Sequence, residues 1–158
     1  MGANLTAADQ IDGGTNTDTV SLNGDYSAGV VFGASTMINV AHLVLDAGHS
    51  YSLTTNVTTV TGGQVLEVNA KALGAGDVLT FDNSAGIGGS ILVESNAGRA
   101  TIIGGTGNDT FVLGATLNSS DHIDGGAGSN TLSISGDYSA SVALDGSWFS
   151  NISTLSLN

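Results

Sequence analysis

The sequence predicts an all-β fold, a right-handed parallel β-helix or β-roll in which the chain winds as a solenoid. Three observations support this prediction: a glycine-rich nonapeptide, short apolar segments separated by turn residues, and a long-range duplication. Segments rich in β-branched residues and bounded by Gly, Asn, Asp and Ser are typical of strands. A β-sandwich is the alternative, because short strands spaced by roughly 10–13 residues occur in both architectures.

The predicted strands are short, and no segment of the chain reads as a convincing helix. The best helical window, 64–73, lacks both caps and helix-forming residues. Strands are expected at 19–22, 30–32, 42–45, 51–54, 65–68, 78–81, 91–94, 101–103, 111–113, 132–134, 142–144 and 154–157.

The chain repeats itself at a fixed offset. Residues 5–46 align without a gap with residues 117–158, and 18 of the 42 positions are identical. Self-similarity at a fixed period is the signature of repeat architectures. The sequence therefore predicts one complete unit of about 112 residues at 1–116 and the start of the next unit at 117–158, stacked on the same solenoid. Stacked units bury their ends against neighbours, so neighbouring units of the same chain are the expected partners.

The duplication also assigns the two faces of a strand. Leu43 and Leu45 remain leucine in the second copy, whereas His42 and Val44 become Thr and Ser. Successive side chains of a strand point to opposite faces. We therefore expect Leu43 and Leu45 to point inward and the alternate positions to point outward.

The nonapeptide at 104–112 reads Gly-Gly-Thr-Gly-Asn-Asp-Thr-Phe-Val and matches the pattern G-G-x-G-x-D-x-U-x in full. Its first six residues predict a turn, and the last three predict a short strand that buries Phe111. Glycines allow the backbone to turn its carbonyl groups toward an ion. Asp109 adds a carboxylate, and Ca²⁺ prefers six to eight oxygen ligands.

Two looser copies of the motif strengthen the expectation of bound Ca²⁺. The turn at 125–130 keeps the glycines but has Asn130 in place of the aspartate. The turn at 13–18 keeps Asp18 but has Asn16 in place of the third glycine. The step from Gly104 to Gly125 fits one coil, for which we expect a length of about 18–25 residues.

Composition restricts the classes of partner. The net charge is −12, with only two basic residues, and this argues against nucleic acid and against anionic membranes. No apolar run reaches the roughly 20 residues that span a bilayer, and no N-terminal signal peptide is visible. The chain has no cysteine, so extra stabilisation is expected from metal ions or repetition.

The stretch 101–134 resembles the RTX, or hemolysin-type, calcium-binding repeat family of secreted bacterial proteins. The wider unit, with its D-x-I-D-G-G and G-D-Y-S-A blocks, is similar to modules of large adhesin-type repeat proteins. The resemblance implies type I secretion, an extracellular or cell-surface location, and folding on external calcium. The absence of a nonapeptide from 47–100 departs from a plain β-roll.

In the family, calcium lies between turns of neighbouring coils. The resemblance therefore implies that turn 104–109 faces turn 125–130. It also implies that the partner coil of turn 13–18 belongs to an upstream unit. The implied ligands, beginning with the carboxylate of Asp109, are Gly105, Gly107, Asp109, Asp121, Asp124, Gly126, Gly128, Asn130, Asp12 and Asp18.

These features favour a non-enzymatic, calcium-stabilised extender module. A calcium-dependent carbohydrate-binding module, with surface glycans as ligands, is the alternative. The histidines are too scattered for a zinc motif, and no nucleophile elbow occurs. Glu67 and Glu94 are read as outward, solvated residues rather than as a glycosidase pair, and Trp148 is read as core variation or a capping patch.

Overall fold

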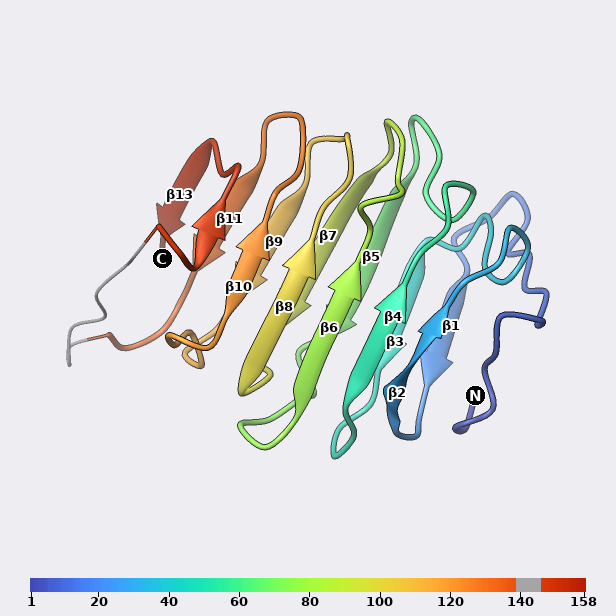
Figure 1. Cartoon of the computed structure of the whole chain (residues 1–158), viewed down its shortest axis with the longest axis horizontal. Helices are drawn as coiled ribbons and strands as arrows, with labels where there is room; N and C mark the ends of the chain where they lie inside the picture. Colours follow the sequence, from blue (N-terminus) through green and yellow to red (C-terminus); the bar gives the residue numbers. More distant parts are fainter. Residues whose placement is uncertain (139–145) are drawn as a thin grey trace.

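The computed structural model describes residues 1–138 and 146–158 as a parallel β-solenoid of about six turns. Two sheets lie face to face, and the chain crosses between them along the long axis from one terminus to the other (Figure 1). All strand-to-strand pairings within the sheets are parallel. The described residues contain no helix. The predicted all-β solenoid is confirmed.

The strands alternate between the sheets along the chain. The seven-stranded sheet contains β1 (Thr19–Leu22), β3 (His42–Leu45), β5 (Val65–Ala70), β7 (Ser90–Ser95), β9 (Thr110–Leu113), β11 (Thr131–Ile134) and β13 (Thr154–Leu157). The six-stranded sheet contains β2 (Tyr26–Val31), β4 (Tyr51–Thr54), β6 (Val78–Asp82), β8 (Arg99–Ile103), β10 (His122–Asp124) and β12 (Phe149–Ser150).

Most predicted strands are confirmed, four of them with their bounds: β1, β3, β4 and β13. The short strands β10 and β12 were not predicted, because their pairing with neighbouring coils defines them more than their own sequence does. The strand predicted at 142–144 lies outside the described residues. Residues 47–100 continue the solenoid through β4 to β8, although they carry no nonapeptide.

The 112-residue period corresponds to five coils. In-register partners lie one coil apart, and the series Thr19, His42, Glu67, Leu92, Thr110 and Thr131 follows one column across the seven-stranded sheet. Coil length varies along this column: the step from Leu92 to Thr110 is among the shortest, and the step from His42 to Glu67 is among the longest. Each unit therefore returns to the same column after five coils of unequal length.

The core consists of columns of inward side chains between the two sheets. Leu43 and Leu45 are fully buried, whereas His42 and Val44 lie on the outer face, as predicted. One column contains Val20, Leu43, Val68, Val93, Phe111 and Leu132 in register. Leu155 and Leu157 are the counterparts of Leu43 and Leu45 in the second copy. They lie at the C-terminal end and are 46% and 70% exposed. Leu155 and Leu157 lie on the edge strand β13 and have a neighbouring strand on one side only, whereas β3, which carries Leu43 and Leu45, lies between β1 and β5.

Two tyrosines fix the chain where it leaves the seven-stranded sheet. Tyr26 begins β2, and its ring stacks on that of Tyr51 with centroids 5.9 Å apart. The Tyr51 hydroxyl donates to the carbonyl of Leu22, while the Tyr26 hydroxyl donates to the carbonyl of Gly2. Tyr26 therefore packs into the core from the first position of β2.

The duplicated leucines provide a matched test of this core. We expect Leu43→Ala to lower the free energy of unfolding by about 2–5 kcal/mol, because it leaves a cavity in a filled column. Leu155→Ala, at the same position of the repeat, should cost less than about 1 kcal/mol because its side chain is partly solvated already. Urea unfolding of both variants measures the difference, and equal losses would contradict the packing described.

Candidate functional site

The nonapeptide turn 104–109 stacks directly on turn 125–130, as predicted. The Ala127 N–H donates to the Gly105 carbonyl at 2.9 Å, and the Ser129 N–H donates to Asn108 Oδ1 at 2.8 Å. A Cβ on Gly126 would lie 2.3 Å from the Gly105 oxygen. Gly126 also has a positive φ of 71°, so this approach and this conformation both require glycine.

Asp109 is buried, and both of its carboxylate oxygens accept backbone hydrogen bonds. Oδ1 accepts the N–H of Ile91 at 2.8 Å, and Oδ2 accepts the N–H of Gly105 at 2.9 Å. Burial raises the pKa of Asp109 above its ordinary range, and these two hydrogen bonds oppose the rise. The carboxylate therefore joins its own turn to β7 of the preceding coil.

Asp121 has the same role on the other sheet. Its Oδ1 accepts the N–H of Ala100 at 2.7 Å, and its Oδ2 accepts the N–H of Asn118 at 2.8 Å. Burial raises its pKa as well. His122 pairs with Thr101, so Asp121 lies opposite Ala100, one position earlier. The Asp121 carboxylate thus binds the backbone of the preceding coil.

Asp124 and Asp12 form a second type of contact, which the duplication reproduces. Asp124 Oδ1 accepts the Gly126 N–H at 2.9 Å and the Asn151 amide at 2.6 Å. Asp12 Oδ1 accepts the Gly14 N–H at 2.9 Å and the Asn39 amide at 2.8 Å. These hydrogen bonds hold the pKa of both carboxyl groups below the usual range.

The two asparagines adopt the left-handed conformation, with φ of 55° at Asn39 and 56° at Asn151. This conformation is uncommon for residues other than glycine, and asparagine tolerates it better than most. Sequence reasoning missed both residues as parts of the turn. The signal was their identity at matching positions of the duplication.

Asn130 closes the second turn with its whole amide group. Its Oδ1 accepts the Asp109 N–H at 2.8 Å. Its Nδ2 donates to the carbonyl of Ala127 at 3.2 Å and to that of Asn151 at 3.0 Å. All hydrogen-bonding groups of this buried side chain therefore have protein partners of the correct polarity.

Asp18 occupies the position of Asn130 in the first turn. A Cβ on Gly13 would lie 2.3 Å from the Asn39 oxygen and 2.9 Å from Asp18 Cβ. A Cβ on Gly125 would lie 2.3 Å from the Asn151 oxygen and 2.8 Å from Asn130 Cβ. The first turn thus repeats the second, with an oxygen in place of the amide nitrogen. Asp18 Oδ2 is buried and has no hydrogen-bond partner.

We call the group formed by Asp18 and the carbonyls of Thr15 and Asn39 the Asp18 corner. Thr15 and Asn39 are the counterparts of Ala127 and Asn151, whose carbonyls accept from the Asn130 amide. A carboxylate oxygen at the position of this amide nitrogen has no hydrogen to donate to such carbonyls. A pocket of about 220 Å³ borders the corner and is lined by Thr15 and Asn39, among others.

The predicted ligands do not gather into one acidic cluster. Among residues 1–138 and 146–158, no group of three or more His, Cys, Asp or Glu side chains is arranged to hold a metal ion. A cation at these turns would therefore depend on backbone carbonyls with one or two carboxylates. Glycine-rich turns supply such carbonyls, so the donor chemistry at the Asp18 corner fits Ca²⁺.

The other polar side chains singled out in the sequence lie on outer faces. Glu67 pairs with His42 at 3.0 Å, and Glu94 pairs with Lys71 at 2.6 Å. The partner of Glu67 lies on the neighbouring strand β3, and the partner of Glu94 directly follows β5.

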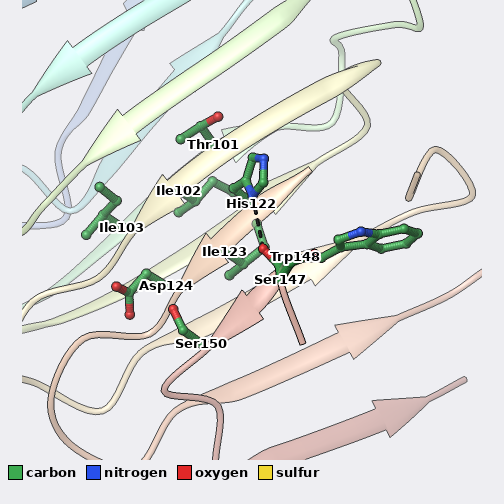
Figure 2. A pocket seen from close by; sticks show the side chains of 9 residues that line it. All are labelled: Thr101, Ile102, Ile103, His122, Ile123, Asp124, Ser147, Trp148 and Ser150. Carbon is green, nitrogen blue, oxygen red and sulfur yellow. Dashed lines mark hydrogen bonds between the residues drawn. The ribbon is translucent and has the colours of Figure 1, made fainter. Parts of the chain in front are cut away.

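The C-terminal part of the six-stranded sheet carries a pocket of about 160 Å³. His122 and Trp148 lie at its rim, and His122 Nδ1 lies 3.2 Å from the Ser147 carbonyl oxygen (Figure 2). Trp148 is half-buried and meets Phe149 edge to face.

The part of the chain that the structure describes contains no helix long and apolar enough to cross a membrane. No family model matches this chain, and no curated protein or solved structure shows a significant match to it.

The opposite pKa shifts predict two kinds of titration in the presence of a chelator. Asp109 and Asp121 should titrate above the ordinary aspartate value of 3.8, and Asp124 should titrate below it. Carboxyl chemical shifts followed by NMR measure this order.

The pKa shifts also determine how the free energy of unfolding changes with pH. Between pH 3.8 and their raised folded-state pKa values, Asp109 and Asp121 bind more protons in the folded state than in the unfolded state. Their contribution to the free energy of unfolding therefore falls as the pH rises through that window. The contribution of Asp124 is present above 3.8 and is lost as the pH falls through its lowered value. Titration of all three near 3.8 would contradict the burial of Asp109 and Asp121 and the hydrogen bonds of Asp124.

Proposed function

We propose that this chain is a non-enzymatic, calcium-binding structural module of a secreted or cell-surface repeat protein of the RTX, adhesin-type class. The observation that carries the proposal is Asp18 Oδ2, a buried acceptor without a donor. A buried polar atom without a partner costs roughly 1–3 kcal/mol. A cation at the Asp18 corner removes this cost, because carboxylate and carbonyl oxygens are the ligands that Ca²⁺ prefers.

The stacked turns 104–109 and 125–130 support the same function in a weaker way. Their glycines bring the carbonyls of Gly105 and Gly107 against the backbone of the next coil. The Gly105 carbonyl and both oxygens of Asp109 already accept backbone N–H groups. A calcium ion at this pair of turns would have to replace those hydrogen bonds, so we assign the first site to the Asp18 corner.

The same chemistry supports an extracellular location for the module. Extracellular calcium modules bind with a Kd of about 10⁻⁴–10⁻³ M, so they fill outside the cell and stay empty in cytosol. Ligand that binds only the folded state stabilises it by RT ln(1 + [L]/Kd). A chain with a net charge of −12 gains further from bound cations, because they reduce its self-repulsion. External calcium would therefore favour folding after export.

A reciprocal pair of substitutions tests the Asp18 corner. Asp18→Asn restores the amide found at Asn130, so we expect it to raise the free energy of unfolding in chelator by about 1 kcal/mol. The same substitution should reduce the stabilisation produced by millimolar calcium. Asn130→Asp should act in the opposite sense on both quantities. Urea unfolding in chelator and in calcium measures all four values.

Asp46→Asn is the charge control, since it removes one negative charge and no described residue hydrogen-bonds to that side chain. If Asp18→Asn leaves the calcium response unchanged, the Asp18 corner is not the calcium site. If melting is identical in chelator and in calcium for the unsubstituted chain, the module binds no calcium that matters for folding.

A carbohydrate-binding module is the second candidate, and the pocket beside Trp148 favours it. Half-buried aromatic rings near polar rims are suited to sugar faces. The pocket volume of about 160 Å³ is below the usual range of roughly 300–1,000 Å³ for ligand sites. A glycan array probed with the full chain in calcium tests this role. Binding that Trp148→Ala abolishes would support it, and the absence of any bound glycan would exclude it.

A further inference from the structure

Within the solenoid, side chains in the turns bind the backbone of the preceding coil. Asp121 Oδ1 accepts the N–H of Ala100, and Asn130 Oδ1 accepts the N–H of Asp109. Both contacts link residues 21 positions apart, which is one coil. They act where the strand ladder is interrupted, so they fix the register of one coil on the next.

The N-terminal end of the solenoid presents the same side chains without their donors. Asp9 and Asp18 are the counterparts of Asp121 and Asn130 at the 112-residue offset. Asp9 Oδ2 accepts the Thr6 N–H at 2.7 Å, as Asp121 Oδ2 accepts that of Asn118. No described residue donates to Asp9 Oδ1 or to the carboxylate of Asp18.

The start of the chain already lies in the path of an incoming strand. The Met1 nitrogen donates to the Ser21 carbonyl, and the Asn23 N–H donates to the Met1 carbonyl at 2.7 Å. One unit later, the Ser135 N–H donates to the Leu113 carbonyl at 3.0 Å. Met1 therefore occupies the place of Leu113, the last residue of β9, and a strand that ended at Met1 would lie in register on β1.

We propose that the N-terminal end is a docking surface for the last coil of another copy of the 112-residue unit. The residues of that copy equivalent to Ala100 and Asp109 donate their backbone N–H groups to Asp9 Oδ1 and to Asp18 Oδ1, as in the Ala100–Asp121 and Asp109–Asn130 contacts, and Asp18 Oδ2 stays available to a cation. The proposal rests on the repeat-array part of the proposed function and not on calcium.

The opposite end supports the same occupant independently. Leu155 and Leu157 are exposed at the C-terminal end, whereas Leu43 and Leu45 are fully buried one unit earlier, where β5 covers them. A coil equivalent to β5 would cover these leucines in the same manner. Both ends of the described solenoid thus lack the neighbours that the repeat itself supplies five coils away.

The test uses a two-unit chain in which an added copy of residues 1–112 is joined directly to Met1. Asp9→Asn in the second unit is compared with Asp9→Asn in the 158-residue chain, both in chelator. Asparagine keeps one oxygen for Thr6 but turns an N–H₂ group toward the incoming N–H. We expect no loss in the single chain and an increase of roughly tenfold in the unfolding equilibrium constant of the two-unit chain.

Asp121→Asn is the matched control, because its preceding coil is present in both chains and it should be costly in both. Hydrogen exchange gives a second measurement: the Ala100 amide of the added unit should be as protected as the Ala100 amide of the single chain. Equal effects of Asp9→Asn in the two chains, or separate unfolding of the two units, would overturn the proposal. Because both measurements are made in chelator, a chain that shows no calcium response would still give the same outcomes for docking.

Discussion

Hydrogen bonding between successive coils is the constraint on which the rest of this structure depends. In a parallel solenoid every strand forms its ladder with the coil before and the coil after it, and buried backbone groups must find partners. The two sheets satisfy this requirement where the chain is extended. In the turns the ladder breaks, and the side chains of Asp109, Asp121 and Asn130 accept the N–H groups that would otherwise be buried without partners.

This constraint explains why acidic residues lie inside an acidic protein. Asp109 and Asp121 are buried because their carboxylates replace missing backbone acceptors, and burial raises their pKa while the hydrogen bonds limit the rise. At the Asp18 corner the side chain has a carboxylate oxygen where Asn130 has an amide nitrogen. That atom converts a satisfied amide into an acceptor without a donor, which is the feature that suits a cation.

Individual contacts between neighbouring coils are the features that the sequence does not predict. Asp121 and Asp124 stand three positions apart before a glycine turn, so both read as metal ligands. Asp121 instead binds Ala100 of the preceding coil, and because the coils differ in length, the sequence does not reveal such a partner. Strands β10 and β12 were missed for a related reason, since their pairing with a neighbouring coil defines them more than their own alternation does.

The sequence by itself determined the all-β class, the inward face marked by Leu43 and Leu45, the stacking of turn 104–109 on turn 125–130 and the 112-residue period, because these depend on local alternation, glycine turns and direct repetition. Only the tertiary structure decided that this period spans five unequal coils and that most of the turn carboxylates bind backbone. It also showed that Asp18 alone among them has a buried oxygen without a partner in the described residues. Hydrogen-bond partners between coils depend on register, and register is a property of the stacked chain.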